Sequence, residues 1–326
     1  MQTPGFWRAG SNCLPSTLLS PFSWFFRIIT WIRQVTTKPW KSPIPIICIG
    51  NLVAGGSGKT PLAINIAKHL QKNGKIVHFL SRGYGGEEKG PLLVDIEIHD
   101  FTCIGDEPLI LASQAPTWVS RDRRAGCLAA AKAGAEIIIM DDGFQNPKVI
   151  KDYSIVVVDG EYGFGNQKLI PAGPLREPIP RGLARAHAVV IVGEDRAGTS
   201  IFFTRHGLSP LSTRLIPTKL PNTIKDKPVV LFAGIGFPEK FFKTVSNLGY
   251  NVVREISFAD HHPYSCSDID YLRNVAKKNE AILLSTEKDA QRLPKSFLNE
   301  VNIISAKIEW EFDEKRNILL NEIISV

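Results

Sequence analysis

The stretch Ile44-Pro-Ile-Ile-Cys-Ile-Gly-Asn-Leu-Val-Ala-Gly-Gly-Ser-Gly-Lys-Thr-Pro61 decides the fold of this chain. Its apolar run, Ile44–Ile49, has no polar alternation and is bounded by proline and glycine, which predicts a fully buried strand. The glycines that follow allow backbone N–H groups to turn inward around a phosphate chain. The apolar periodicity after Pro61 predicts a helix whose positive N-terminal end is directed at the same anions. Strand, loop and helix thus occur in the order that a phosphate-binding loop requires.

Two side chains at the end of this loop predict that it binds a nucleotide together with Mg²⁺. Lys59 places a positive charge at the β- and γ-phosphates, and the Thr60 hydroxyl is a ligand for Mg²⁺. The usual pattern has glycine where this chain has Val53, so the match is close but incomplete. The alternative is a glycine-rich turn with a chance Gly-Lys-Thr. The residues predicted to bind the nucleotide are Val53, Ala54, Gly55, Gly56, Ser57, Gly58, Lys59 and Thr60.

Length and composition set the limits for the rest of the chain. Its 326 residues are enough for a large core and for two domains. The hydrophobic fraction of 44% and the charged fraction of 22% are ordinary for a globular protein and exclude global disorder. The net charge of +7 suits anionic partners such as nucleotides, acidic lipid headgroups or nucleic acid. The 5 cysteines are odd in number and contain no C-x-x-C, which indicates a reducing compartment and argues against disulfides or a zinc site.

The segment Phe22–Val35 predicts an amphipathic helix near the N-terminus. On a helix its residues Ser23, Arg27, Thr30 and Gln34 form one narrow polar stripe, and aromatic and aliphatic side chains cover most of the remaining surface. The run is too short for a membrane span, which needs about 20 apolar residues, and no small-residue cleavage site follows it. The pattern favours a helix that lies in a membrane interface, with packing on the protein's own core as the alternative.

Beyond the loop, apolar runs of strand length alternate with helical stretches, which predicts an α/β fold with a mainly parallel sheet flanked by helices. The predicted strands are 76–80, 117–119, 136–140, 154–158 and 188–192, and a second αβ rhythm has strands near 229–233, 251–254, 281–284 and 302–304. The predicted organisation is a membrane-associated helical segment at 1–40, a P-loop NTPase-like core at 41–220 and a smaller C-terminal α/β domain at 221–326, with a linker at 219–227.

Polar clusters follow the predicted strands, at the edge where parallel sheets bind their ligands. Asp141 comes after four apolar residues and is predicted to hold Mg²⁺, directly or through water, opposite Thr60. Asp142 adds negative charge that favours a divalent cation, although a surface turn with two aspartates is the alternative. A group of arginines at or near strand ends predicts bidentate phosphate contacts. Its members include Arg82, Arg121, Arg123 and Arg176.

Two further motifs are ambiguous on their residues alone. Gly105-Asp-Glu-Pro108 reads most simply as an acidic helix N-terminus. The pair His261 and His262 reads most simply as surface histidines, because no third ligand stands at metal spacing.

Taken together, these motifs resemble those of the tetraacyldisaccharide 4'-kinases, the lipid A 4'-kinases of Gram-negative bacteria. They run in family order over nearly the whole chain. The stretches that carry the resemblance are Gly55-Gly-Ser-Gly-Lys-Thr-Pro61, Ser81-Arg-Gly-Tyr-Gly-Gly86, Gly105-Asp-Glu-Pro108, Asp141-Asp-Gly-Phe-Gln145, Pro171-Ala-Gly-Pro-Leu-Arg-Glu177, Asp260-His261 and Thr286-Glu-Lys-Asp289.

The resemblance implies transfer of the ATP γ-phosphate to the 4'-hydroxyl of a tetraacylated glucosamine disaccharide 1-phosphate, which gives lipid IVA for lipopolysaccharide. It further implies Mg²⁺, work at the cytoplasmic face of the inner membrane, and no nucleic-acid partner. It makes Asp106 the candidate base and His261 its partner, with His262 left open, and it adds Lys59 to the catalytic residues. The residues implied for Mg²⁺ are Thr60, Asp141, Asp142 and Glu177, and those for the substrate are Arg82, Arg121, Arg123, Gln145 and Arg176.

Three other classes fit the residues less well. Partitioning or metal-insertion ATPases share the glycine-rich loop but have a second lysine where this chain has Ala54. A GTP-binding switch protein requires Asn-Lys-x-Asp, which Thr286-Glu-Lys-Asp289 imitates only weakly. A membrane adaptor without enzymatic activity would explain the N-terminal helix but not the phosphate and Mg²⁺ residues.

Overall fold

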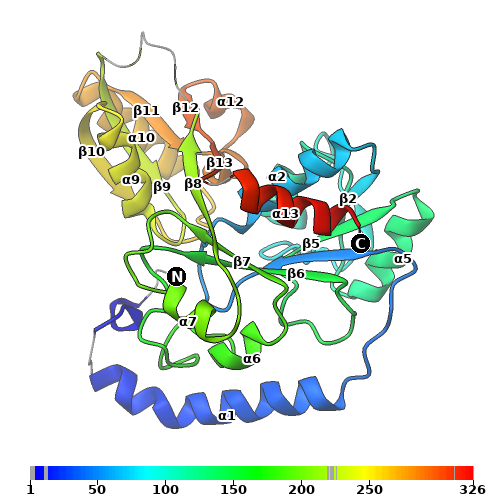
Figure 1. Cartoon of the computed structure of the whole chain (residues 1–326). Helices are drawn as coiled ribbons and strands as arrows, with labels where there is room; N and C mark the ends of the chain where they lie inside the picture. The colour runs from blue at the N-terminus through cyan, green and yellow to red at the C-terminus, as the bar shows by residue number, and fades with distance from the viewer. Residues whose placement is uncertain are drawn as a thin grey trace.

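The computed structural model describes residues 4–10, 14–218, 220, 224, 226–311 and 313–325. Within them the larger of two sheets has nine strands in the order β13-β8-β7-β6-β1-β5-β2-β4-β3 (Figure 1). Their bounds are β1 Ile46–Gly50, β2 Val77–Ser81, β3 Leu92–Leu93, β4 Thr117–Val119, β5 Ile137–Asp141, β6 Tyr153–Asp159, β7 Ala188–Val192, β8 Leu211–Pro217 and β13 Ala306–Trp310. Its neighbouring strands pair in parallel except for β3 with β4 and β13 with β8. The predicted, mainly parallel sheet is confirmed.

Helices cover both faces of this sheet, because its central strands are apolar on both sides. In β1, Ile47 and Ile49 join the core beneath α2, whereas Ile46 and Cys48 face the opposite side. The first face carries α2 Lys59–Lys72, α4 Asp106–Ala112 and α13 Asp313–Ile324, and the second carries α5 Arg123–Lys132, α6 Ile179–Leu183 and α7 Ser200–Arg205. The short α3, Phe101–Ile104, leads into α4. The P-loop NTPase-like architecture predicted from the sequence is confirmed.

A smaller sheet beside the first one has four parallel strands in the part of the chain that the structure describes (Figure 1). Its order is β10-β9-β11-β12, with bounds β9 Pro228–Ala233, β10 Asn251–Ser257, β11 Ile282–Thr286 and β12 Val301–Ile304. Its helices are α9 Pro238–Asn247, α10 Cys266–Lys278, α11 Glu287–Ala290 and α12 Lys295–Leu298. Separate apolar clusters pack on its two faces, so this sheet has a core of its own.

The end of the chain returns to the larger sheet, although residues 221–326 were predicted to form one smaller domain. β13 pairs antiparallel with β8, and Leu320 and Ile323 of α13 join the apolar cluster on the face of α2. We therefore propose that the smaller unit comprises residues 228–304 and that residues 306–324 belong with the larger unit. The linker predicted at 219–227 lies mostly outside the described residues.

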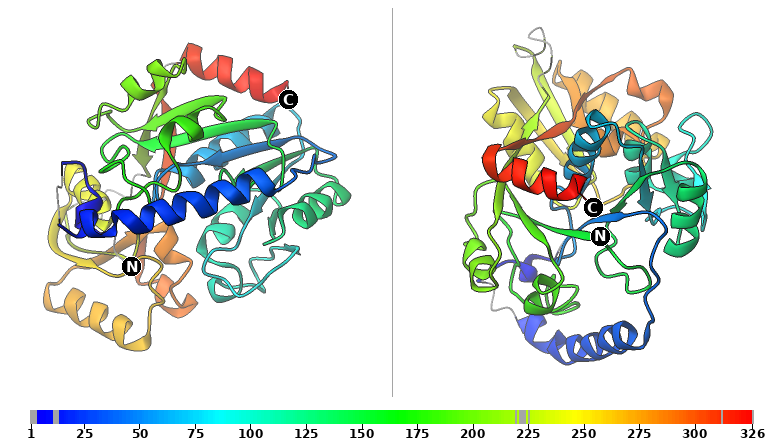
Figure 2. Two further views of the ribbon diagram at one scale, coloured as in Figure 1. Left: turned by 90° about the horizontal axis from the view of Figure 1, so that it is seen from below. Right: turned by 45° about the vertical axis from the view of Figure 1, so that its right-hand side comes forward.

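Helix α1, Leu14–Thr36, runs along the outside of the larger unit and follows the 3-10 turn Gly5–Trp7 (Figures 1 and 2). Ser16 and Ser23 face the protein and are buried, and their hydroxyls donate to the carbonyls of Ala172 and Leu169 at 2.8 and 2.7 Å. The apolar side chains point outward instead, and they include Leu18, Phe22, Trp24, Phe25, Ile29 and Val35. The alternative that α1 packs its apolar face on the core is wrong.

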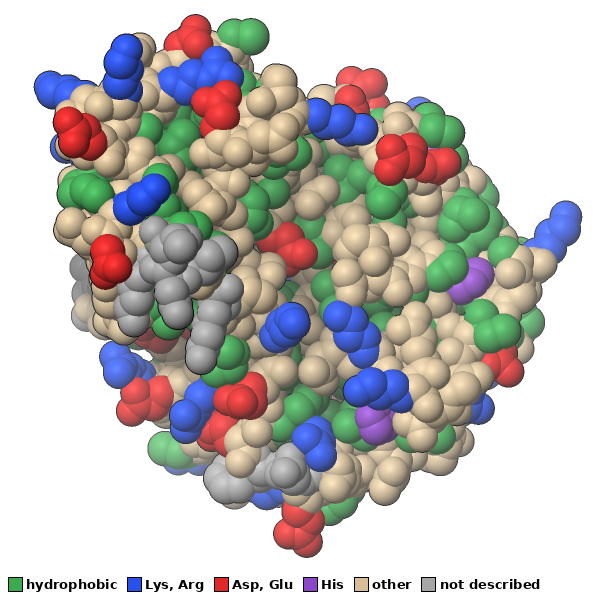
Figure 3. All heavy atoms as spheres, turned by 90° about the horizontal axis from the view of Figure 1, so that it is seen from above, with side chains coloured by type: hydrophobic (Ala, Val, Ile, Leu, Met, Phe, Trp, Pro, Cys, Tyr) green, Lys and Arg blue, Asp and Glu red, His purple; other side chains and the backbone are tan. Residues whose placement is uncertain are grey.

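None of the helices in the described residues is long and apolar enough to cross a membrane. On the face seen from above, basic and acidic side chains are interspersed (Figure 3), so the net charge does not gather in one patch on that face.

The packing of α13 gives a matched pair of substitutions. Ile323 is 0% exposed, whereas Ile318 on the same helix is 56% exposed. We expect Ile323→Ala to lower the free energy of unfolding by about 2–4 kcal/mol, because it leaves a cavity in the core. Ile318→Ala should change it by only about 0.5 kcal/mol, as for other surface positions. Urea denaturation of both variants measures the difference, and equal values would show that α13 does not belong to the core of the larger unit.

Candidate active site

The predicted phosphate loop lies between β1 and α2. Gly58 has φ +84° and immediately precedes Lys59, the first residue of α2. Asn51, the residue directly after β1, is fully buried, and its side-chain nitrogen donates to Gly55 O and Ser57 Oγ, each at 3.2 Å. Asn51 is not among the site residues predicted from the sequence. A polar residue next to a buried strand and a glycine loop was the signal that could have identified it.

The pairing of β1 with β5 places Asp141 beside Thr60. Ile49 lies opposite Asp141 in the register, and Thr60 Oγ1 lies 3.4 Å from Asp141 Oδ2. Burial and the negative charges of Glu107 and Asp142 raise the pKa of Asp141 to about 7, although Lys59 and Lys288 act to lower it. Its Oδ1 is buried without a hydrogen-bond partner among the described residues. A buried carboxylate oxygen without a partner next to a hydroxyl is a suitable place for a cation.

No cluster of three or more His, Cys, Asp or Glu side chains that could hold a metal was found in the described parts of the chain. Mg²⁺ in nucleotide sites takes one or two protein ligands, with phosphate oxygens and waters completing its shell. Thr60 and Asp141 therefore fit a nucleotide-bound Mg²⁺ better than a cation held by protein alone.

Asp142 has a different partner set from its neighbour. Its Oδ1 lies 2.7 Å from Arg176 Nη1 and 3.7 Å from Lys59 Nζ. Although burial acts to raise the pKa of Asp142, these two cations bring it well below the usual range. Asp142 therefore stays ionised and holds Lys59 close to the loop, and its predicted role as a metal ligand stays a prediction.

Glu177 and Gln145 contact each other next to the start of the phosphate loop. Gln145 Nε2 donates to Asn51 O at 2.8 Å and to Glu177 Oε1 at 3.1 Å. Glu177 is also paired with Arg185, whose Nη2 contacts both carboxylate oxygens at 2.5 and 2.6 Å. These contacts connect Glu177 through Gln145 to the start of the phosphate loop at Asn51. The roles predicted for Glu177 with the metal and for Gln145 with the substrate stay predictions.

The predicted substrate arginines divide by exposure. Arg123 is buried and donates to Ser120 O at 2.8 Å, and burial lowers its pKa to about 10. Arg121 is exposed and donates to Gly86 O and Glu87 O at 3.1 and 3.2 Å. Arg82 is exposed as well. Arg176, the fourth predicted arginine, is partly exposed and pairs with Asp142. The contacts of all four arginines with substrate stay predictions.

Asp106 begins α4 in a position that only glycine at residue 105 permits. Gly105 has φ +84°, and a Cβ there would lie 2.2 Å from Tyr84 O. This close approach brings the Tyr84 loop against the start of α4. The Asp106 carboxylate is buried, and its Oδ1 accepts a hydrogen bond from Glu107 N at 2.9 Å.

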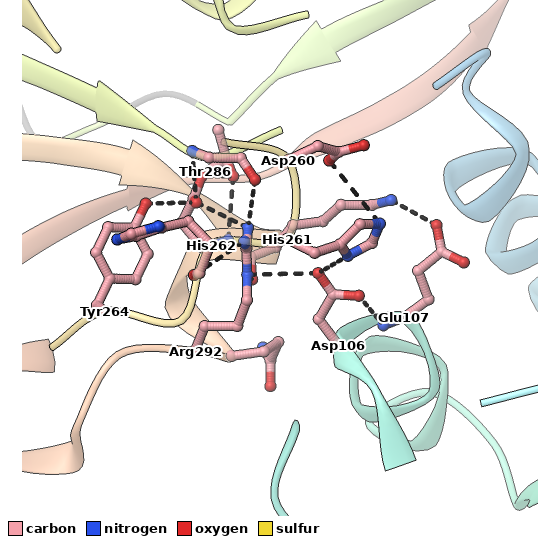
Figure 4. Close-up of polar contacts among 12 residues, drawn as sticks. Asp106, Glu107, Asp260, His261, His262, Tyr264, Thr286 and Arg292 are labelled. Atoms are coloured by element: carbon pink, nitrogen blue, oxygen red, sulfur yellow. Dashed lines mark hydrogen bonds and ion pairs between the residues drawn. The ribbon is translucent and has the colours of Figure 1, made fainter. Parts of the chain in front are cut away.

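His261, on the loop after β10, completes a pair with Asp106 across the two units (Figure 4). Its Nδ1 lies 3.0 Å from Asp106 Oδ2. The hydrogen bond to Asp106 is the largest of the effects that raise the pKa of His261. For Asp106, burial acts to raise the pKa, but His261 and the nearby cations Lys288 and Arg292 bring it below its usual value. Both side chains line an opening of about 210 Å³.

The neighbouring histidine points elsewhere. His262 Nε2 lies 3.1 Å from Asp268 Oδ2, and its ring stacks on Phe258 with centroids 4.8 Å apart. The sequence left open which of the two histidines is the partner of Asp106. The geometry assigns this place to His261.

The site defines a P-loop phosphotransferase. It has a glycine loop with Lys59 at the central strand, a carboxylate at the end of the adjacent strand and a buried Asp–His pair.

The family model described as Tetraacyldisaccharide-1-P 4'-kinase matches residues 15–325. Tetraacyldisaccharide 4'-kinase of Paramagnetospirillum magneticum is 46% identical over 311 residues, covering 95% of each chain. That of Rhodospirillum centenum is 45% identical, covering 100% of this chain and 97% of its own.

A solved structure is similar over its whole length. The "apo" form of LpxK from Aquifex aeolicus in complex with ATP has 30% identity and a TM-score of 0.75, covering 95% of this chain and 99% of its own. The chain belongs to the tetraacyldisaccharide-1-P 4'-kinase family.

Proposed function

We propose that this chain transfers the γ-phosphate of ATP to the 4'-hydroxyl of a tetraacylated glucosamine disaccharide 1-phosphate, giving lipid IVA. The observation that carries the proposal is the contact of His261 with Asp106 at the edge of the phosphate site. Glu107, next to Asp106, lies within electrostatic reach of both Lys59 and Asp141. ATP bound to the Aquifex aeolicus relative supports the choice of nucleotide.

The loop residues would hold the phosphates, with Thr60 and Asp141 holding Mg²⁺. Mg²⁺ held there would neutralise negative charge on the phosphates. Lys59, which is buried near Asp142, would turn its ammonium to the γ-phosphate. Asn51 and Gln145 keep the loop in shape, so that its N–H groups need little reorganisation as charge develops.

His261 is the member of the pair that can meet the acceptor hydroxyl. An ionised carboxylate only accepts hydrogen bonds, so His261 Nδ1–H donates to Asp106, and Nε2 of the neutral ring is left as a proton acceptor. The His261 side chain is 29% exposed, whereas that of Asp106 is 2% exposed. We therefore assign proton uptake to His261 Nε2 and stabilisation of the imidazolium to Asp106, instead of direct proton uptake by Asp106.

The 4'-oxygen forms a bond to the γ-phosphorus as the bond between that phosphorus and the bridging oxygen breaks. ADP leaves, and the hydroxyl proton passes to His261 Nε2 and then to solvent.

The test is phosphorylation of the tetraacylated disaccharide 1-phosphate in detergent micelles by the full chain with ATP and Mg²⁺. Mass spectrometry should find one added phosphate, with fragmentation placing it on the 4'-position. Lys59→Ala should lower kcat by about 10²–10³-fold, because it removes a charge that stabilises the transition state. Lys72→Ala, on the exposed end of the same helix, is the control. No added phosphate with wild type, or full activity of Lys59→Ala, would contradict the proposal.

We further propose that α1 lies on the cytoplasmic face of the inner membrane. Ser16 and Ser23 of α1 are turned toward the protein, so the exposed apolar side chains of the helix are available to enter the acyl region. Arg27, Arg33 and Lys38 lie in or just after the helix, where they can meet anionic headgroups.

Substitution of Phe22, Phe25 and Ile29 by serine tests this surface without removing the helix. Binding to anionic liposomes should weaken by about tenfold or more per side chain, since each apolar side chain contributes about 1.5–3 kcal/mol when buried. KM for the lipid should rise and KM for ATP should not. Ile318→Ser, at an exposed position of α13, is the matched control. Liposome binding that survives all three substitutions would exclude α1 as the membrane contact.

A further inference from the structure

α11 and the residues just beyond it connect the two halves of the Asp106–His261 pair. Lys288 of α11 belongs to the smaller unit, and its Nζ lies 2.5 Å from Glu107 Oε1 on the larger unit. Arg292, one turn later, lies with its Nε 3.4 Å from Asp106 Oδ2. Two cations of the smaller unit thus face two consecutive carboxylates of the larger unit.

Arg292 also fixes the backbone around His261. Its Nη2 donates to Gly234 O at 2.9 Å and its Nη1 donates to His262 O at 3.2 Å (Figure 4). His261 N donates to the same Gly234 carbonyl at 3.0 Å. The Arg292 side chain is only 1% exposed and is paired with Asp289 at 2.8 Å. The segment that carries Lys288 therefore also sets the position of the imidazole.

The contacts close into a ring. Lys288 holds Glu107, Glu107 N is bonded to Asp106 Oδ1, Asp106 is bonded to His261, and Arg292 connects the histidine loop back to α11. A shift of the turn at the start of α4 would move Glu107 and Asp106 together. In this ring the side chain of Lys288 contacts Glu107 directly and reaches Asp106 only through its charge.

We propose that Lys288 is a positioning residue, which through its ion pair with Glu107 holds the carboxylate of Asp106 at the correct distance from the His261 imidazole. The inference rests on the proposed function. The charge of Lys288 keeps Glu107 ionised, since it is the main cause of the lowered pKa of that carboxyl. Removal of one partner leaves a half-buried charge without its counterion, so the turn should relax away from α11.

The test is a double-mutant cycle in the lipid kinase assay. Lys288→Met should lower kcat by about 10²-fold, because an error of about 1 Å in positioning costs that much, with KM for ATP unchanged. Glu107→Gln should have the same effect, and the double variant should lose no more than the worse single variant. Lys288→Arg, which keeps the charge, should recover most of the activity.

Lys240→Met is the matched control. Lys240 also joins the two units, by an ion pair with Asp159 at 2.5 Å, but it contacts neither α4 nor the histidine loop through that pair. Its loss should leave kcat near that of wild type. If Lys288→Met does not fold, Glu107→Gln tests the same pair from the larger unit.

The outcomes separate the two proposals. An inactive wild type would refute the proposed function. If wild type is active, any of three results would refute the positioning role alone. The first is full activity of Lys288→Met or Glu107→Gln. The others are a kcat loss in Lys240→Met equal to that in Lys288→Met, and additive losses in the double variant.

Discussion

The hydrogen bond between His261 and Asp106 is the contact on which the site depends, because its two members come from different sheets. Asp106 stands at the start of a helix on the larger unit, and His261 stands on a loop of the smaller one. In the proposed mechanism, neither unit alone supplies both a proton acceptor and its counterion. On that proposal, we expect activity only when the smaller unit lies against the phosphate site.

The sequence was sufficient for the larger sheet and its ligand loop, because these depend on local signals. A buried apolar strand, glycines and a Lys-Thr pair follow one another without interruption, and the strand that carries Asp141 is equally apolar. Short or partly exposed strands gave no such signal. β3 has 2 residues and β8 is exposed over much of its length, so both were missed.

Prediction from the sequence also failed where the structure depends on contacts between residues that are far apart in the chain. The return of β13 and α13 to the larger sheet depends on pairing with residues almost a hundred positions earlier. The choice between His261 and His262 depends on a left-handed backbone at His261, with φ +57°, which turns the two rings in different directions. Asn51 and the Lys288–Glu107 pair became visible as functional candidates only through their partners.

The central claim is that Asp106 tunes His261, and titration of the His261 imidazole by NMR tests it most directly. In wild type its pKa should lie above the ordinary value of about 6.5. The contact should therefore stabilise the fold at low pH and lose that effect as pH rises through the raised pKa. In Asp106→Asn the pKa of His261 should fall, whereas Asp268→Asn, which removes the partner of His262, should leave it unchanged. The same His261 pKa in wild type and Asp106→Asn would contradict the account.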